Sequence, residues 1–277
     1  MFKKAYLEIS NVCNLSCAFC PGNARAPHFM TEAEFRTAAE KLRPYSDYLY
    51  FHLMGEPLLH PLLGRFLEIA QELGFRVILT TNATLLAKTQ ELLLNAPGLH
   101  KVNISLQSFE ANKETGPLQD YLSSCISFAK AAAEKDKICV FRLWNRNGLD
   151  TRNSEIEEQL KESFASPWEE QRRGIRLQNR VWLEYGEKFD WPDLSSDRDR
   201  ETGFCYGLRD QIGVLCDGTV VPCCLDGGGE IRLGNIFQQD MQEILQSERA
   251  RRLYDGFSQR RIVEKLCRTC GYAARFD

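Results

Sequence analysis

Three cysteines lie within eight residues of one another, and their spacing is typical of a metal-cluster site. Cys13, Cys17 and Cys20 are arranged as C-x3-C-x2-C. Thiolates are the usual protein ligands of iron–sulfur clusters. A [4Fe–4S] cube contains four irons. This segment therefore supplies ligands for three irons, and the fourth iron would remain open to a small molecule.

Two other interpretations of these cysteines have to be weighed. The three positions share one face of an α-helix, so they could be a buried cysteine stripe. They could also bind zinc, but a structural zinc site needs four ligands. The surrounding sequence disfavours a helix, since a strand-like alternation over 5–9 precedes the cysteines, while Asn11, Asn14 and Pro21-Gly22 favour turns. We therefore predict a cluster-binding loop.

With Phe19 just before the last cysteine, this segment resembles the radical S-adenosylmethionine (radical SAM) superfamily. The resemblance implies that SAM chelates the open iron through its amino and carboxylate groups. It also implies that an electron from the cluster splits SAM, which gives methionine and a 5′-deoxyadenosyl radical. That radical abstracts hydrogen from a substrate C–H bond. The cofactor carries this chemistry, and the protein supplies position and electrostatics.

A second group of cysteines lies near the C-terminus, at Cys205, Cys223, Cys267 and Cys270. Residues 211–215 and 219–221 alternate around Asp217-Gly218, which predicts a β-hairpin that ends at Cys223. Four thiols make a complete site, and a zinc ribbon would use the same C-x2-C pair. Cys216 and Cys224 fall outside this pattern, and Cys224 could replace its neighbour as a ligand.

Residues 205–270 also resemble the SPASM and twitch auxiliary-cluster domains of radical SAM enzymes. The full SPASM form carries seven cysteines and two clusters. This sequence ends seven residues after Cys270, so the shortened twitch form, with one auxiliary [4Fe–4S] cluster, fits better. The resemblance therefore implies two [4Fe–4S] clusters in the chain.

The resemblance also indicates which residues hold SAM. Gly55-Glu56 is similar to the Gly-Gly-Glu motif that contacts the SAM amino group, with Met54 in place of the first glycine. A carboxylate suits a charged amino donor, although Glu56 could also be a solvated loop acid. The other implied contacts lie at the ends of successive predicted strands, and they are Thr81, Asn82, Ser105 and Gln107.

Arg142 is an unusual charge within an apolar run, so it needs a partner if it is buried. The SAM carboxylate and an internal acid are equally good candidates for that partner. The remaining Cys125 and Cys139 lie in helix and strand patterns, and we expect them to be inert buried thiols.

Strand and helix patterns alternate over the first two thirds of the chain, which is typical of a parallel sheet. We expect an α/β fold, an open partial (βα)6 TIM-like barrel, over residues 1–190. A small auxiliary-cluster domain, a β-hairpin plus helices, should follow over 191–277. Thr31 and Glu34 predict a capping box. The predicted strands are 5–9, 48–53, 75–79, 101–107, 138–144 and a weak one within 175–183. The predicted helices are 31–42, 61–73, 85–94, 118–135, 154–164 and 239–254.

Composition limits the classes of function. The chain has 277 residues and a net charge of −3, which gives no reason to expect nucleic acid or an anionic membrane as a partner. No apolar run reaches the ~18 residues of a membrane span, and no signal peptide opens the sequence. Eleven cysteines without an export signal indicate metal rather than disulfides. We therefore expect a cytoplasmic protein.

These patterns together predict a radical SAM enzyme that consumes SAM as a co-substrate. We expect it to oxidise a C–H bond in a small metabolite, or in a peptide as a maturase that forms thioether or C–C crosslinks. An electron donor such as flavodoxin or ferredoxin is the implied protein partner. A non-catalytic zinc or iron–sulfur sensor that binds RNA is the alternative of another class, and the arginines between 249 and 261 support it. The sequence does not identify the substrate.

Overall fold

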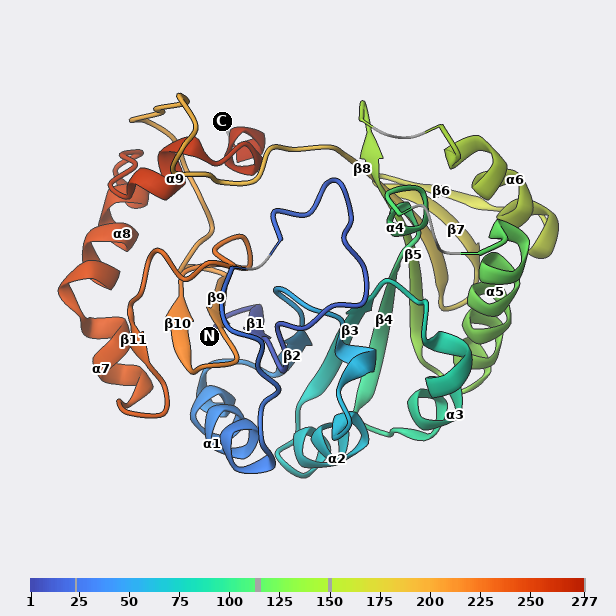
Figure 1. The fold of residues 1–277 in the computed structure, drawn as a ribbon, viewed down its shortest axis with the longest axis horizontal. Helices are drawn as coiled ribbons and strands as arrows, with labels where there is room; N and C mark the ends of the chain where they lie inside the picture. Colours follow the sequence, from blue (N-terminus) through green and yellow to red (C-terminus); the bar gives the residue numbers. More distant parts are fainter. Residues whose placement is uncertain (23, 113–115, 149–150, 277) are drawn as a thin grey trace.

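The computed structural model describes residues 1–22, 24–112, 116–148 and 151–276. One curved sheet runs through the molecule with the strand order β11-β10-β9-β1-β2-β3-β4-β5-β8-β7-β6 (Figure 1). Neighbouring strands pair in parallel from β1 through β5 to β8. The six strands of this barrel are β1 (Lys4–Leu7), β2 (Tyr48–Phe51), β3 (Arg76–Thr81), β4 (Leu99–Ser105), β5 (Ile138–Arg146) and β8 (Val181–Glu187). The predicted partial (βα)6 barrel is therefore confirmed.

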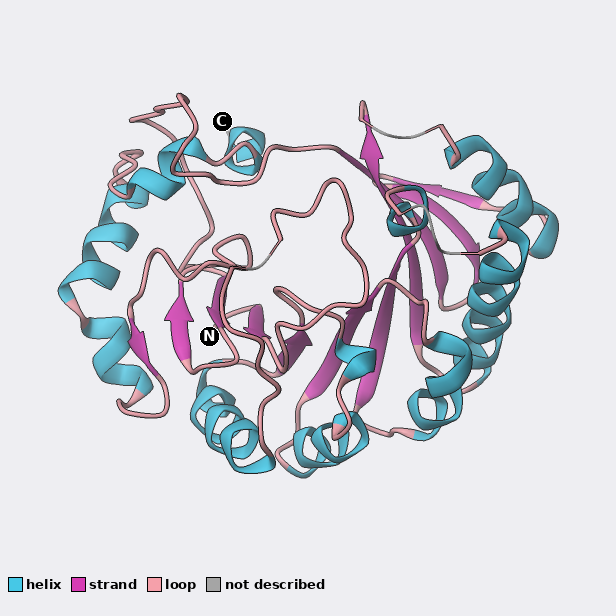
Figure 2. Ribbon diagram, in the orientation of Figure 1, coloured by secondary structure: helices cyan, strands magenta, loops and turns pink. Residues whose placement is uncertain are grey.

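Helices cover the convex side of the sheet (Figure 2). They are α1 (Glu32–Leu42), α2 (Leu63–Glu72), α3 (Leu86–Asn95), α5 (Leu118–Glu134) and α6 (Asn153–Ser163), with the short α4 (Gln107–Glu110) after β4. The capping box predicted for α1 is present, since the Thr31 side chain accepts from the Glu34 backbone N–H and the Glu34 side chain accepts from the Thr31 backbone N–H. Large side chains such as Phe35, Phe66 and Phe141 fill the layer between helices and sheet, and all three are fully buried.

The opposite, concave face of the sheet carries polar side chains. In β4, Val102 and Ile104 belong to the main apolar core, whereas Asn103 lies between them on the other face, as strand periodicity requires. The Asn103 amide donates to the Thr80 hydroxyl of the neighbouring strand at 3.2 Å. In β5, Phe141 and Leu143 are both fully buried. Arg142 lies between them in the sequence and therefore on the other face of the strand. The concave face is therefore suited to a polar ligand.

The weak sixth strand predicted within 175–183 is wrong in detail. Two antiparallel strands occupy that region, because β7 (Gly174–Gln178) turns back into β8. The turn contains Arg180 with φ of 67°, a conformation that usually calls for glycine or asparagine. No glycine or proline marks the reversal, so composition alone did not reveal it. The edge strand β6 (Glu169–Gln171) pairs with β7.

The C-terminal region continues the same sheet. The predicted hairpin is present as β9 (Gln211–Val214) and β10 (Thr219–Val221), followed by β11 (Gly234–Asn235). Strand β9 pairs in parallel with β1, so the hairpin extends the barrel strands at that edge. Gly218 has φ of 84° at the turn, which explains the Asp-Gly signal.

The single helix predicted over 239–254 is wrong, because two helices are present: α7 (Met241–Gln246) and α8 (Glu248–Ser258). Ser247 separates them with ψ of 150°, and its side chain accepts from the Ala250 backbone N–H. A serine in this role caps a new helix rather than continuing the old one. The last helix, α9 (Lys265–Thr269), contains Cys267. No helix within the described ranges is long and apolar enough to cross a membrane.

Candidate active site

The first cysteine group lies on a loop that leaves the end of β1. Residues 11–22 contain no helix, so the buried cysteine stripe is excluded. The loop arcs across the space that the curved sheet encloses (Figure 1). Cys13 and Cys20 are exposed and Cys17 is half-buried. The Cys20 backbone N–H donates to the Cys17 carbonyl at 2.9 Å, which closes a turn between these two thiols. Phe19 is half-buried in this turn.

Two asparagine amides point at sulfur atoms of this loop. The Asn112 Nδ2 atom donates to Cys17 Sγ at 3.1 Å, and its Oδ1 atom accepts from the Ser16 backbone N–H at 3.1 Å. The Asn82 Nδ2 atom lies 3.9 Å from Cys13 Sγ and donates to Asn14 Oδ1 at 3.0 Å. Sequence reasoning missed Asn112, because it lies 95 residues from the thiol that it contacts. Hydrogen bonds to sulfur tune the potentials of iron–sulfur clusters.

Glu56 is a buried acid and not a solvated loop acid, with only 2% of its surface exposed. Its Oε1 atom accepts from the Thr81 hydroxyl at 2.7 Å and from the Leu58 backbone N–H at 3.0 Å, and its Oε2 atom accepts from the Asn82 backbone N–H at 2.7 Å. Burial raises the pKa of Glu56 to about 7, and these hydrogen bonds oppose the rise. The carboxylate therefore joins the ends of β2 and β3, and it keeps acceptor capacity for one more donor.

Gly55 allows the segment before Glu56 to pack against the cluster loop. Its φ is 77°, and a Cβ atom at this position would lie 2.4 Å from the Ser10 carbonyl oxygen and 2.9 Å from that of Val12. The Glu56 backbone N–H donates to the Val12 carbonyl at 2.8 Å. A glycine is required here both by conformation and by space.

Three further predicted residues lie at the end of β4, just after it and in the middle of β5. Ser105 and Arg142 are direct neighbours in the register of these strands. Gln107 begins α4 rather than ending the strand, and its Oε1 atom is buried without a hydrogen-bond partner among the described residues. Buried polar atoms normally have partners. This oxygen atom is therefore available to a ligand, which is compatible with the predicted role.

The structure gives Arg142 an internal acid. Its Nε atom lies 3.9 Å from Glu184 Oε2, and its guanidinium stacks over the Trp144 ring at 4.4 Å from the ring centre. Its Nε atom makes no hydrogen bond among the described residues. Burial lowers the pKa of Arg142. Of the two partners expected from the sequence, the structure brings the internal acid within reach.

An ion pair joins the exit of the cluster loop to the C-terminal hairpin. The Arg25 Nη2 atom donates to both carboxylate oxygens of Glu8 at 2.7 Å. Glu8 also accepts from the backbone N–H groups of Met54 at 3.1 Å and Cys216 at 3.1 Å. Arg25 donates in addition to the Gly227 carbonyl at 2.9 Å. The sequence analysis assigned no role to either charged residue.

The four cysteines of the second group lie close enough to influence one another. Burial raises the pKa of the Cys205 thiol to about 11, and the neighbouring Cys270 adds to the rise. Burial also raises the pKa of Cys223 well above its usual value, with Cys205 and Cys267 among its charged neighbours. Thiols of this kind stay protonated until a metal displaces the proton. The donor set therefore fits a thiolate-bound cluster.

The two cysteines left outside the pattern have other neighbours. Cys216 is buried, and its Sγ atom accepts from Arg25 Nη1 at 3.6 Å. Cys224 packs with Tyr6 and Tyr50, and its Sγ atom lies 4.0 Å from Gln211 Oε1. Cys125 and Cys139 are fully buried in the main core, as expected. Cys216 therefore lies apart from the group of four, whereas Cys224 lies beside it, as a neighbour of Cys223, Cys205 and Cys270.

Among the residues that the structure describes, no three histidine, cysteine or acidic side chains stand close enough together to share one metal ion.

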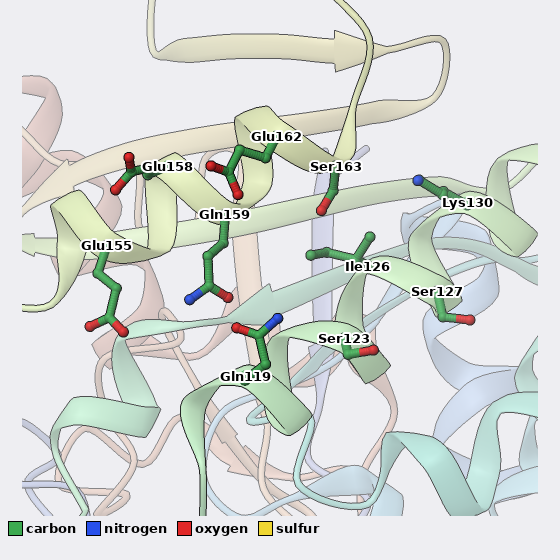
Figure 3. Close-up of a pocket in the computed structure, with 10 residues that line it drawn as sticks. All are labelled: Gln119, Ser123, Ile126, Ser127, Lys130, Glu155, Glu158, Gln159, Glu162 and Ser163. Atoms are coloured by element: carbon green, nitrogen blue, oxygen red, sulfur yellow. The ribbon is translucent and has the colours of Figure 1, made fainter.

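A groove on the outside of the barrel lies away from this site. It has a volume of about 670 Å³ and runs between α5 and α6 on the outside of the barrel. Figure 3 shows its lining, which includes Gln119 and Ser123 from α5 and Glu155, Glu158 and Glu162 from α6. The helices α5 and α6 cover the convex side of the sheet, so this groove is separated from the cysteine loop by the sheet itself. It is not the site of the predicted chemistry.

Two protein families match the chain. Residues 7–145 match the model of the radical SAM superfamily, and residues 205–271 match SPASM, an iron–sulfur cluster-binding domain. No curated protein sequence matches the chain.

Several solved structures share the fold. BtrN in complex with AdoMet and 2-DOIA has a TM-score of 0.62 at 20% identity, over 98% of this chain and 93% of that chain. The anSMEcpe structure with AdoMet and the Kp18Cys peptide has a TM-score of 0.66 at 14% identity, over 100% and 91%. SuiB from Streptococcus suis, bound to the precursor peptide SuiA, has a TM-score of 0.60 at 16% identity, over 98% and 70%. At these identities the likeness shows the fold alone.

The cysteine loop, the glycine–glutamate segment beside it and the two family matches all indicate the same family. The chain belongs to the radical SAM superfamily, as an enzyme that binds a [4Fe–4S] cluster and SAM, and it carries a C-terminal SPASM iron–sulfur cluster-binding domain.

Proposed function

We propose that this enzyme removes two electrons from a substrate C–H group, with SAM consumed as a co-substrate. One observation carries the proposal: Cys205, Cys223, Cys267 and Cys270 are gathered in the C-terminal region, where each of these thiols has at least two of the others as neighbours. Four thiols match the four irons of one cube, so no iron of this cluster would be open to bind substrate. Electron transfer is then its plausible role.

Each part of the chain has a proposed task. When bound, the clusters and SAM supply a 5′-deoxyadenosyl radical and an electron acceptor. Cys13, Cys17 and Cys20 would hold the first cluster, within a radical SAM core that we place at 1–190. The four later cysteines would hold a single auxiliary cluster within 191–277. The substrate would lose a hydrogen atom, then a proton and one further electron, which is a net dehydrogenation or an oxidative crosslink.

The SAM contacts follow from the strand ends. Glu56 would accept from the SAM amino group with the capacity that its internal hydrogen bonds leave free. Gly55, Phe19 and Thr81 would shape that part of the site. The polar side chains proposed for the remainder of SAM are Asn82, Ser105 and Gln107, and the orphaned Gln107 Oε1 atom supports this assignment. Arg142 stays a candidate for the SAM carboxylate, although Glu184 competes for it.

The substrate is a small polar metabolite or a peptide. The structure titles of the neighbours include both kinds of molecule, 2-DOIA for BtrN and a Kp18Cys peptide for anSMEcpe. The polar concave face is compatible with either. We place the enzyme in the cytoplasm, with a flavodoxin or ferredoxin as electron donor.

The test uses the anaerobically reconstituted enzyme with a strong reductant and SAM. Slow release of 5′-deoxyadenosine and methionine is expected even without substrate, and Cys17→Ala should abolish it. With a deuterated substrate, one deuterium should appear in 5′-deoxyadenosine for each product formed. Cys223→Ala should still transfer deuterium but yield no oxidised product. A product at the oxidation level of the substrate would contradict the proposal.

A further inference from the structure

Positive charge is concentrated in one segment of the C-terminal region. Residues 247–270 contain seven basic side chains and three acidic ones, in a chain whose net charge is −3. Five of the basic residues are exposed. We call these five the basic surface: Arg251 and Arg252 on α8, Arg260 and Arg261 in the turn after it, and Lys265 at the start of α9.

The basic surface is not neutralised by neighbouring acids. Within the described residues, none of its five side chains forms an ion pair, whereas the two other arginines of the segment do. Arg249 pairs with Glu264 at 2.8 Å, and Arg268 pairs with Asp199 at 3.3 Å. Unpaired exposed charges of one sign create a field that attracts an oppositely charged partner.

Part of this surface, the turn with Arg260 and Arg261, lies beside a segment that leads into the auxiliary cysteines. The Gly203 backbone N–H donates to the Arg260 carbonyl at 2.9 Å, and the Ile262 backbone N–H donates to the Glu201 carbonyl at 2.8 Å. Thr202 and Arg261 form the bridge between these two hydrogen bonds. The basic turn is thus hydrogen-bonded to the strand-like segment just before Cys205. On the other side, Lys265 is two positions from Cys267.

We propose that the basic surface docks an acidic one-electron carrier protein that exchanges electrons with the auxiliary site. This inference rests on the proposed oxidation. The substrate C–H bond breaks when its hydrogen atom passes to the 5′-deoxyadenosyl radical. The substrate radical then loses a proton to solvent and one electron to the auxiliary cluster. The oxidised carrier takes up that electron. A separate reduced donor supplies the one electron that cleaves SAM, so each turnover oxidises one donor and leaves one singly reduced carrier.

The surface favours such a protein over single-stranded nucleic acid. Single strands are bound by basic grooves combined with aromatic rings on which bases stack. Tyr254 is the exposed aromatic residue of α8, but the Arg209 guanidinium lies over its ring at 4.2 Å from the centre. That guanidinium already occupies one face of the ring. Electron-transfer partners, by contrast, bind through small and largely electrostatic contacts.

The experiment measures binding of the reconstituted full-length enzyme to an oxidised flavodoxin and to an oxidised ferredoxin by calorimetry. Two variants reverse parts of the basic surface, Arg251→Glu with Arg252→Glu, and Arg260→Glu with Arg261→Glu. The control is Arg172→Glu with Arg173→Glu, which reverses another adjacent and exposed pair beside β6. The control changes the net charge equally but lies at the opposite edge of the sheet.

We expect at least one of the two carriers to bind the wild-type enzyme. Each basic-surface variant should bind that carrier roughly tenfold or more weakly at low salt, because complementary charge guides such encounters. The control should bind within about twofold of wild type, and raising the ionic strength from about 0.01 M to about 0.15 M should weaken wild-type binding. Equal affinities of wild type and both variants would overturn the proposal, as would failure of both carriers to bind at low salt. Tighter, competing binding of a single-stranded RNA oligomer would also overturn it.

A second readout separates this inference from the proposed function. Iron content and reductant-driven SAM cleavage with dithionite should be unchanged in both variants, because the basic surface holds no cluster ligand. If these properties are normal and carrier binding is unaffected, the docking surface is wrong and the oxidation proposal stands. If wild-type enzyme cleaves no SAM, the oxidation proposal fails regardless of the binding result.

Discussion

The Glu8 carboxylate accepts two 2.7 Å hydrogen bonds from the Arg25 guanidinium, and this pair links the two halves of the chain. The Glu8 side chain is fully buried and that of Arg25 is 16% exposed. The same carboxylate binds the backbone of Met54, beside the SAM motif, and that of Cys216 at the turn of the C-terminal hairpin. One ion pair therefore holds the cluster loop, the SAM motif and the hairpin in place relative to one another.

Removing Arg25 should destabilise the protein strongly. Arg25→Met leaves the Glu8 carboxylate buried without its cation, which costs about 3–5 kcal/mol in comparable cases. The double variant Glu8→Gln with Arg25→Met should recover part of this loss, because no charge is then left unpaired. Urea unfolding of the wild type and these variants measures the effect. A loss below about 1 kcal/mol in Arg25→Met, the range of exposed pairs, would show that the pair is not structural.

Gly55→Ala should weaken SAM binding. The new Cβ would lie 2.4 Å from the Ser10 carbonyl oxygen, so the SAM motif or the cluster loop has to move. The matched control is Gly22→Ala, since Gly22 has a similar φ of 74° and nothing within 4 Å of its Cβ position. Both variants carry the conformational strain of about 1 kcal/mol, but only Gly55→Ala carries the clash. Equal SAM affinities in calorimetry of the two reconstituted variants would refute the close-packing argument.

Asn112→Ala should lower the reduction potential of the first cluster. The Asn112 amide donates to Cys17 Sγ, and a donor to sulfur stabilises the more negative, reduced cluster. Asn179→Ala, at an exposed turn between β7 and β8, is the control. Spectroelectrochemical titration followed by electron paramagnetic resonance measures both potentials. An unchanged potential in Asn112→Ala, with full iron content, would mean that this amide only shapes the loop.

SAM affinity should depend on pH through Glu56. Burial raises the pKa of this carboxyl group from 4.5 to about 7 in the free protein, whereas the acceptor of the SAM amino group is the ionised form. Affinity should therefore fall as the pH is lowered below about 7, approaching tenfold per unit. Glu56→Gln should bind SAM more weakly at pH 8 and show a flat profile. A profile of the same steepness in the variant would assign the pH dependence to another group.

Much of this architecture could be predicted from local patterns. The Thr31 capping box and the Asp217-Gly218 turn each depend on residues close together in the sequence, and both appear as expected. The division between α7 and α8 was missed because a single serine cap interrupts an otherwise continuous helical pattern. The reversal at Arg180 was missed because its backbone conformation carries no compositional signal.

Contacts across the fold could not be predicted in the same way. Asn112 meets Cys17 only because α4 ends beside the cluster loop, and Glu8 meets Arg25 only because that loop returns to the end of β1. Ser105 and Arg142 are neighbours because β4 and β5 pair side by side. Glu184 lies near Arg142 because it belongs to β8, the second strand of the hairpin that the sequence did not reveal. Long-range partners follow from the topology and are not visible in a single sequence.

The most direct test of the account is the iron content of the triple variant in which Cys13, Cys17 and Cys20 are replaced by alanine. After anaerobic reconstitution, wild-type protein should contain about eight irons and the variant about four, because each cube holds four. Elemental analysis together with Mössbauer spectroscopy measures both the metal and the cluster type. Zinc in place of iron in the variant, or about eight irons remaining in it, would contradict the assignment of one auxiliary [4Fe–4S] cluster to Cys205, Cys223, Cys267 and Cys270.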